Sequence, residues 1–342
     1  MKKMFNCLML LFSVFVCFFF CAVLPPGGRE SDLPSCNYRF TFISPFANAG
    51  YWGSIAYGMA QADDAYHTNT KFVGFMESDA QAMSEAIRSE ICPGPDGIIT
   101  SGESDPRIVR ALEEARAADI PVVLIDNDNA DIDRLCYIGA DNYEMGRLAG
   151  KDMTENISHP LYAAVIIGNG SSENQQLRLQ GFQDELALHP DCHVETVLEA
   201  NYSLLTVREK LPGILEENPE INGIFCAEGY SSIVTGELLD TMGKGYDEMR
   251  VVVSGNPDEI LKHIASGRYY STIIQESDIM GKLAVEVLKN YQEGTLPEKD
   301  VIYIENISIS KENLEGIKAY ESEGVTWHLY NGNLLQIPQS TN

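Results

Sequence analysis

A run of carboxylates and amides follows directly after an apolar strand in the stretch Pro121-Val122-Val123-Leu124-Ile125-Asp126-Asn127-Asp128-Asn129. The mostly β-branched residues 122–125 predict a strand buried on both faces, and open α/β sheets bind ligands at the carboxyl ends of such strands. Asp126 and Asn127 can each make two hydrogen bonds from one planar group, which suits the vicinal hydroxyls of a sugar or polyol. The stretch alone leaves an alternative equally open, in which these side chains form a turn and cap the next segment.

Polar and aromatic residues also stand at the ends of several other predicted strands. They are Tyr51, Trp52, Gln176, Arg178, Glu228 and Gln275. The rings of Tyr51 and Trp52 could stack on the apolar face of a pyranose, or they could pack against the neighbouring loop. Each polar residue taken alone is ordinary, and Gln176 and Arg178 at a helix start are solvated by default. Together with Asp126, these residues suggest a cleft lined by hydrogen-bonding groups.

The elements that position these residues alternate strictly between strand and helix. Hydrophobic spacing first predicts strands over 38–43, 71–76, 97–100 and 122–125, with helices over 51–65, 79–91 and 105–118. The alternation restarts with strands over 137–139, 162–167, 194–198, 223–226, 250–253 and 271–274, and helices over 143–155, 174–188, 205–217, 231–242 and 257–265. A last helix over 279–291 and strand over 301–304 most simply return to a lobe already built. Two such series predict an α/β protein with two similar lobes, each a parallel sheet with helices on both faces.

Length and charge narrow the range of functions. A chain of 342 residues can bury one large core or two of ordinary size, so two domains are expected. With 50 acidic against 24 basic residues, the formal charge is -26, which opposes non-specific attraction to nucleic acid or to anionic lipid. No helix-turn-helix stretch precedes the first predicted strand, so a nucleic-acid partner is not expected.

The N-terminal residues form a segment separate from the predicted fold. Two lysines precede an apolar run from Met4 to Leu24, which is long enough to cross a bilayer as one transmembrane helix. Positive charge before the run would leave the amino end in the cytoplasm and the rest of the chain outside. A cleaved signal peptide is the alternative, but three phenylalanines precede Cys21 where cleavage or lipid attachment needs small residues. We therefore expect a membrane anchor over 1–24 and a linker over 25–37.

Signals for metal, nucleotide or catalytic chemistry are weak. Five of the eight cysteines lie outside the apolar run, which allows two disulfides and one buried thiol without assigning the pairs. Cys226 sits in an apolar strand and is expected in the core. No cysteine pair has zinc-type spacing, and the six histidines are scattered. The stretch Gly168-Asn169-Gly170 lacks the third glycine of a dinucleotide motif because Glu173 stands there, and Ala130 interrupts a calcium-loop pattern. We expect no cofactor, no metal and no enzymatic activity.

Six short segments, taken in order, carry a family resemblance. They are residues 46–52 (FANAGYW), 54–60 (SIAYGMA), 125–127 (IDN), 139–142 (GADN) with Gly146, 177–182 (LRLQGF) and 272–275 (TIIQ). Any one of them is weak, but their order and spacing together resemble the type 1 periplasmic sugar-binding proteins. That group includes the ribose- and galactose-binding proteins and the core of the lac repressor. The resemblance spans about residues 38 to 320.

The resemblance implies roles for individual positions. In such proteins the aromatic pair at Tyr51 and Trp52 sandwiches the sugar. Asp126 binds adjacent hydroxyls, and Gln275 forms a hydrogen bond from the hinge. Tyr202 looks like the aromatic residue of the second lobe. On this basis the expected site is built by both lobes.

Four positions depart from the ribose-binding members. Gln176 and Asn127 stand where those proteins have arginines. Glu228 replaces an asparagine, and Ser254 replaces an aspartate. The resemblance therefore implies a neutral pentose, hexose or polyol as ligand, with ribose itself in doubt.

The resemblance also implies the domain organisation. The N-terminal lobe would comprise 38–141 plus 276–304, and the C-terminal lobe 142–275 plus 305–330. The two Rossmann-like lobes would be joined by a three-stranded hinge, with crossings near Asp141, Gln275 to Ser277, and Glu305. A ligand would close the cleft between them.

Two biological roles remain open for such a protein. The first is an extracytoplasmic solute-binding protein that delivers a sugar or polyol to an ABC-type importer and its permease. The rival is a membrane-anchored sensor subunit whose closed form engages a membrane histidine kinase, and the anchor slightly favours this role. In both, the protein would be attached to the cell membrane by its N-terminal segment, or secreted if that segment is cleaved.

Overall fold

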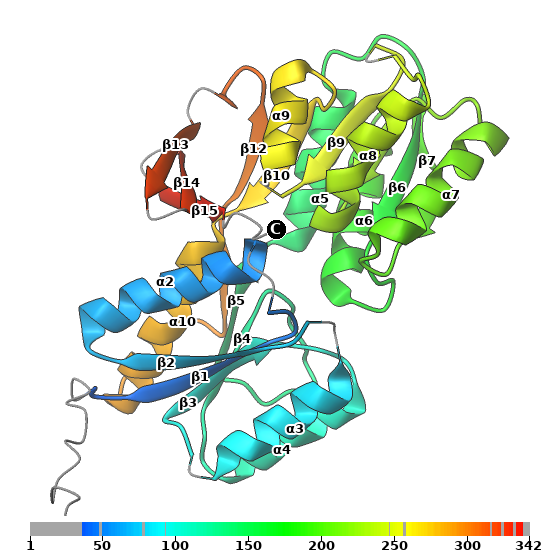
Figure 1. Cartoon of the computed structure of the whole chain (residues 1–342). Coiled ribbons are helices and arrows are strands. Elements are labelled where there is room, and N and C mark those ends of the chain that lie inside the picture. The colour runs from blue at the N-terminus through cyan, green and yellow to red at the C-terminus, as the bar shows by residue number, and fades with distance from the viewer. Residues whose placement is uncertain are drawn as a thin grey trace, which may run out of the picture. The chain divides into compact units, whose positions relative to one another are not determined.

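The structure is a computed structural model that describes residues 36–47, 50–76, 79–92, 94–245, 247–255, 258–314, 317–322, 325–330 and 333–337 (Figure 1). The expected membrane anchor over 1–24 lies outside these residues. Within the described ranges, none of the helices combines the length and the apolar character that crossing a bilayer requires.

The first sheet is a six-stranded parallel sheet with the strand order β11-β5-β4-β3-β1-β2. Its strands are β1 (Arg39–Ser44), β2 (Asn69–Gly74), β3 (Gly97–Ser101), β4 (Val122–Ile125), β5 (Cys136–Ala140) and β11 (Val301–Ile304). All residues of β3, β4 and β5 are buried. This burial explains why β3 and β4 read as continuous apolar or β-branched runs in the sequence.

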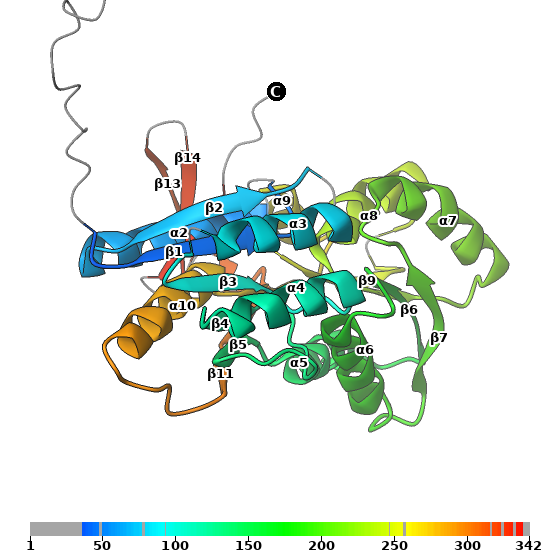
Figure 2. The same cartoon turned by 90° about the horizontal axis from the view of Figure 1, so that it is seen from below.

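Helices cover both faces of the first sheet. On one face α2 (Gly50–Tyr66) packs beside α10 (Ser277–Gln292), and Figure 1 shows them as neighbouring blue and orange helices. Their apolar faces and the sheet enclose a core that contains Phe42, Ile55 and Met280. On the opposite face α3 (Ala80–Ile91) and α4 (Pro106–Ala117) lie side by side (Figure 2), over a second core that contains Ile87 and Leu112.

The second sheet repeats this design with the strand order β12-β10-β9-β8-β6-β7. Its strands are β6 (Leu161–Ile167), β7 (Cys192–Glu199), β8 (Gly223–Cys226), β9 (Arg250–Ser254), β10 (Ser271–Gln275) and β12 (Asn306–Ser310). Only β12 is antiparallel to its neighbour. One face is covered by α5 (Asn142–Thr154) and α6 (Glu173–Leu186), and the other by α7 (Leu204–Glu217), α8 (Gly229–Thr241) and α9 (Asp258–Ser266).

The chain passes between the two sheets at three places. They lie between β5 and α5 at Asp141, between β10 and α10 at Glu276, and between β11 and β12 at Glu305. The α/β fold with two lobes and largely parallel sheets is confirmed, and the crossings fall where the family resemblance implied them. The carboxyl ends of β3, β4, β8, β9 and β10 carry the residues considered below.

A third sheet differs from the sequence-based expectation. It is an antiparallel meander of β13 (Ile317–Ser322), β14 (Val325–Tyr330) and β15 (Asn333–Ile337), and β15 lies against α2 and α10. We had expected residues 305–330 to belong to the C-terminal lobe, without a third sheet. Strands that follow one another closely pair with each other first, so this segment forms its own sheet instead of extending the second one.

The cysteines do not form the disulfides that the sequence allowed. Cys36, Cys92, Cys136, Cys192 and Cys226 are all free thiols. Cys226 is fully buried in the second lobe, as expected for a core residue.

Candidate functional site

Asp126 lies at the carboxyl end of β4 in a left-handed backbone conformation, with φ of 66°. Its backbone N–H donates to Ile138 O at 3.2 Å, and its backbone oxygen accepts from the Tyr137 hydroxyl at 2.8 Å. Both contacts come from β5, so the neighbouring strand holds a conformation that non-glycine residues adopt at some cost. The carboxylate is thereby aimed away from the sheet, and its Oδ1 accepts a hydrogen bond of 2.7 Å from the Tyr51 hydroxyl.

Tyr51 joins the two lobes through its hydroxyl. The same oxygen that donates to Asp126 lies 3.0 Å from Gln275 Oε1, at the end of β10 in the second sheet. A phenol has one hydrogen, so it can donate to only one of these two acceptors at a time. The sequence-predicted residues Tyr51, Asp126 and Gln275 therefore meet at one point, although they stand far apart in the chain.

Asn127 forms a second contact between the lobes. Its side-chain amide donates to Gly102 O at 2.9 Å, which fixes the loop after β4 against the loop after β3. Its side-chain oxygen lies 3.4 Å from the backbone N–H of Asn174, in the first turn of α6. Asn127 is buried, and its amide is used largely for positioning these loops.

Three aromatic rings form a cluster that also spans the lobes. The ring of Phe46, after β1, lies 6.4 Å from that of Tyr202 and 6.3 Å from that of Tyr230. Tyr202 and Tyr230, both from the second lobe, lie 6.4 Å apart with nearly perpendicular rings. Gly168 permits this arrangement, because a Cβ there would lie 2.2 Å from the Tyr202 ring. The glycine that resembled part of a nucleotide motif thus makes room for an aromatic ring.

Trp52 does not direct its indole toward these strand ends. It is 8% exposed within the core between α2 and the first sheet, where its ring lies 6.2 Å from that of Phe42. Its indole meets the Tyr51 ring edge to face at 5.4 Å. Consecutive helical residues point about 100° apart, so Tyr51 faces the strand ends while Trp52 supports it from the core.

Glu228 and Ser254 stand at the ends of β8 and β9, as the sequence predicted. Glu228 is buried and caps α8, with its two oxygens accepting from Tyr230 N–H at 2.6 Å and from Ser231 N–H at 2.7 Å. Ser254 Oγ is also buried and has no hydrogen-bond partner within the described ranges. The Ser254 hydroxyl therefore keeps its donor and its acceptor capacity for a ligand.

Gln176 is exposed and donates to Gly170 O at 2.7 Å, so the structure does not bring it into contact with Asp126 or Tyr51. Its neighbour Gln175 is the buried glutamine, and it accepts from Gly168 N–H at 2.9 Å. Asn174, Gln175 and Arg178 form the inward face of the start of α6. The position implied by the family resemblance is thus one residue away from the buried face of the helix.

Two further charged residues lie at this site: Arg178, which the sequence placed among the residues that suggest a cleft, and Glu103, which was not considered. Taken alone, Arg178 was expected to be solvated, but it is 6% exposed and donates to Asn142 Oδ1 and to Ala227 O, both at 2.8 Å. Glu103 follows β3 at the same sheet edge as Asp126, and Ser101 Oγ donates to its carboxylate at 3.0 Å. Glu103 could have been predicted from the sequence, because it closely follows a buried strand, as Asp126 does.

Burial shifts the pKa values of the acidic groups at this site upward. Desolvation raises the pKa of Asp126, while the Tyr51 hydrogen bond and the Arg178 charge oppose this rise. Desolvation and then the charge of Asp126 raise the pKa of Tyr51 well above its ordinary value. The pKa values of Glu103 and Glu228 are also raised, in both cases first by desolvation. Burial raises the pKa of Tyr202 to about 12, so both tyrosines are neutral donors at neutral pH.

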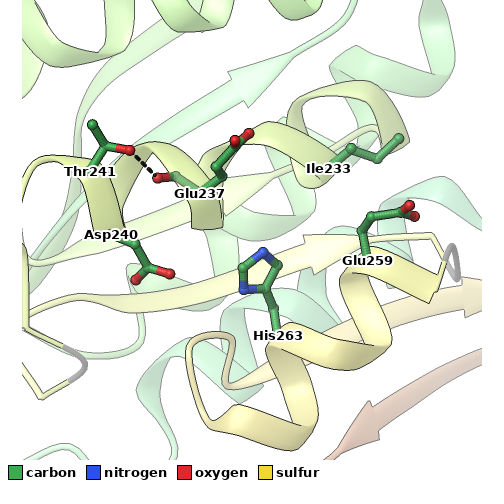
Figure 3. Close-up of a pocket in the computed structure, with 6 residues that line it drawn as sticks. All are labelled: Ile233, Glu237, Asp240, Thr241, Glu259 and His263. Carbon is green, nitrogen blue, oxygen red and sulfur yellow. Dashed lines mark hydrogen bonds between the residues drawn. The ribbon is translucent and has the colours of Figure 1, made fainter.

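A separate open hollow of about 600 Å³ lies between α8 and α9 on the second lobe (Figure 3). It is lined by Ile233, Glu237, Asp240, Thr241, Glu259 and His263, and it contains none of the residues predicted from the sequence. Burial lowers the pKa of His263. Neither here nor elsewhere in the described ranges do histidine, cysteine and carboxylate side chains gather into a group that could hold a metal ion.

Comparison with known proteins agrees with this geometry. The family model described as a periplasmic binding protein domain matches residues 40–296. The D-apiose import binding protein of Actinobacillus succinogenes is 23% identical over 287 residues, which cover 83% of this chain and 92% of that protein.

Solved structures with the same fold cover nearly the same part of the chain. The glucose-galactose binding protein GanP of Geobacillus stearothermophilus superposes with a TM-score of 0.76 at 24% identity, over 81% of this chain and 98% of that one. A chain of the XylFII-LytSN complex superposes with a TM-score of 0.73 at 25% identity, over 80% and 98%. The chain therefore belongs to the periplasmic binding protein domain family, and the resemblance to its type 1 sugar-binding members is confirmed.

Proposed function

We propose that this protein is an extracytoplasmic solute-binding protein that binds a monosaccharide or polyol between its lobes and delivers it to an ABC-type importer. The observation that carries the proposal is the meeting of Tyr51, Asp126 and Gln275, in which strand ends of both sheets converge on one hydroxyl. The printed names of relatives, such as the D-apiose and ribose import binding proteins, support it.

The proposed binding residues come from both lobes and offer complementary chemistry. Asp126, Asn127, Ser254 and Gln275 supply planar or hydroxyl polar groups, and Tyr51 and Tyr202 supply rings with neutral donors. Trp52 supports the site indirectly by packing on Tyr51, and Glu228 does so by capping the start of α8. Gln176 lies beside the loop before α6. A ligand that lacks or inverts a hydroxyl would leave buried polar groups unpaired, which is the physical source of selectivity.

Ligand binding between hinged lobes works as a population shift. A ligand that touches both lobes has more contacts in the closed arrangement than in an open one, so it increases the closed fraction. The three crossings at Asp141, Glu276 and Glu305 are the positions where the backbone would absorb the motion. A permease that recognises only the closed form would then bind the protein with its ligand.

A second candidate function is a membrane-anchored sugar sensor that signals to a histidine kinase. The likeness to a chain from the XylFII-LytSN complex favours this candidate, as does the apolar segment from Met4 to Leu24. Neighbouring genes that encode a permease and an ATPase would support transport. Neighbouring genes that encode a kinase and a response regulator would support sensing.

Isothermal titration of the protein against pentoses, hexoses and inositols tests the binding function shared by both candidates. We expect one or a few related compounds to bind in a one-to-one complex and to be recovered chemically unchanged. Turnover of the compound would point to an enzyme instead. Absence of binding to the whole panel would contradict the proposal.

A further inference from the structure

The candidate site contains more negative than positive charge. Glu103, Asp126 and Glu228 carry three carboxylates at the ends of β3, β4 and β8, and the charge of Arg178 acts on Asp126 and Glu228. With all four groups ionised, three carboxylates against one guanidinium leave two negative charges. Within the part of the chain that the structure describes, none of the three carboxylates forms an ion pair with a basic side chain.

The protein compensates these carboxylates unequally. Glu228 receives two backbone N–H groups at the start of α8, where the helix dipole also favours an anion. Among the described residues, Glu103 accepts a side-chain hydrogen bond from the hydroxyl of Ser101 alone, and Asp126 from the hydroxyl of Tyr51 alone. Glu103 and Asp126 lie on adjacent loops, which the side-chain amide of Asn127 joins by donating to Gly102 O at 2.9 Å. After desolvation, the charge of Asp126 also raises the pKa of Glu103. The described residues therefore balance the ionised carboxylates of Glu103 and Asp126 less well than that of Glu228.

The side-chain oxygen of Asn174, on the neighbouring helix α6, also lacks a donor within the described ranges. Asn174, whose backbone N–H lies 3.4 Å from Asn127 Oδ1, is 7% exposed, and its side-chain oxygen has no partner within the described ranges. Asn174 thus has a buried, unused side-chain acceptor, and its backbone N–H lies next to the loop that carries Asp126. Buried acceptors beside unbalanced carboxylates call for a ligand that donates hydrogen bonds and carries positive charge.

The aromatic cluster suits the same ligand. The rings of Phe46, Tyr202 and Tyr230 lie within 6.4 Å of one another, and aromatic faces attract cations. The charges of Asp126, Glu103 and Arg178 all act on Tyr202, which places its ring within reach of the unbalanced carboxylates.

We propose that the ligand carries a protonated amino group, which the carboxylates of Glu103 and Asp126 bind. This inference rests on the proposed function and narrows its ligand to amino sugars and aminated polyols. An ammonium group supplies three donors and one positive charge, which match the free acceptors and the unbalanced carboxylates. A neutral sugar would leave the excess charge in place.

Titration with matched ligand pairs tests the inference on the unmodified protein. The probes are D-glucosamine with D-glucose, D-galactosamine with D-galactose, and inosamine with inositol, each at a pH where the amine is protonated. We expect one amino compound to bind at least roughly tenfold more tightly than its hydroxyl counterpart. Its N-acetyl derivative, which is neutral, is expected to lose that advantage.

The variant Glu103→Gln tests where the amino group binds. Glutamine keeps the acceptor for Ser101, so the fold is expected to remain and the preference for the amine to fall about tenfold. Glu113→Gln, on the exposed face of α4, is the matched control and should leave the preference unchanged. An equal effect of Glu103→Gln on amino and neutral ligands would overturn the assignment of Glu103.

The outcomes separate this inference from the proposed function. If neutral compounds bind as tightly as their amino counterparts or more tightly, the inference fails and the proposed function stands. If no compound of either set binds, the proposed function fails together with the inference. Because the ligand pairs are compared on the unmodified protein, this distinction does not depend on any variant folding.

Discussion

The hydroxyl of Tyr51 lies 2.7 Å from Asp126 Oδ1. This contact ties the first turn of α2 to the end of β4, and the same hydroxyl reaches Gln275 in the second lobe at 3.0 Å. We base the proposed ligand site on this hydroxyl, because a strand end of each lobe approaches it.

Asp126→Ala is expected to weaken binding severely while the fold remains intact. The substitution removes the acceptor for Tyr51 and for the ligand, and loss of a charged hydrogen-bonding group costs on the order of 3 kcal/mol, or about 100-fold in affinity. Isothermal titration measures the loss, and circular dichroism checks the fold. Asp131→Ala, at an exposed position in the same loop, is the control. An unchanged affinity of Asp126→Ala would remove that residue from the site.

Tyr51→Phe is expected to weaken binding about tenfold, because one hydrogen-bonding hydroxyl at the meeting point of the lobes is lost. The aromatic ring and its packing on Trp52 remain, so the thermal midpoint should change little. Tyr57→Phe, on the same helix, controls for removal of a phenol hydroxyl. Equal affinities for the Tyr51→Phe and Tyr57→Phe proteins would mean that the bridge between the lobes does not contribute to binding.

Arg178→Met is expected to destabilise the second lobe. It leaves the side-chain oxygen of Asn142 and the backbone oxygen of Ala227 without their donor, at a cost of about 3 kcal/mol. Urea unfolding measures the change in free energy. Arg208→Met, which breaks an exposed ion pair with Glu237, should cost at most about 1 kcal/mol. A similar small cost for both variants would show that Arg178 is not a structural anchor.

Asp278 is expected to make the protein less stable as pH rises. The residue is 7% exposed in the first turn of α10, and burial raises its pKa to about 6 from an ordinary value of 3.8. Between these values the folded state binds more protons than the unfolded state, so the free energy of unfolding falls as pH rises from about 4 to about 6. The full effect would be roughly 3 kcal/mol.

Asp278→Asn isolates this contribution. The neutral amide cannot ionise, so the variant should be more stable than the parent at pH 7 and should lose most of the difference at pH 4. Urea unfolding at several pH values provides the measurement, with Asp64→Asn on the exposed face of α2 as control. A stability difference that does not vary with pH would exclude Asp278 as its source.

The sequence predicted the position of strands well where every residue of the strand is buried. Residues 122–125 were predicted as a buried strand and form β4 without any shift. The strand predicted over 97–100 extends by one residue, to Ser101. Strand ends of one parallel sheet meet at one edge, but Asp126 and Gln275 follow strands of different sheets. The family resemblance, and not the strand pattern, implied that they share one site.

Side-chain direction was less predictable, because it depends on packing between elements far apart in the sequence. Trp52 turns into the core since it lies one position after Tyr51 on a helix. Solvation was the default for Arg178 taken alone, and its burial could not be predicted because its partners come from α5 and from the end of β8. The side chain of Glu228 caps its own helix by accepting from two backbone N–H groups, which its position after a strand does not reveal.

A crystal structure of the protein with its tightest-binding amino sugar or polyol tests the central claim most directly. The account predicts that the compound lies between the lobes, with polar groups on Asp126 and Gln275 and a ring face on Tyr202. A compound bound elsewhere, or a space between the lobes filled by the protein's own side chains, would contradict it.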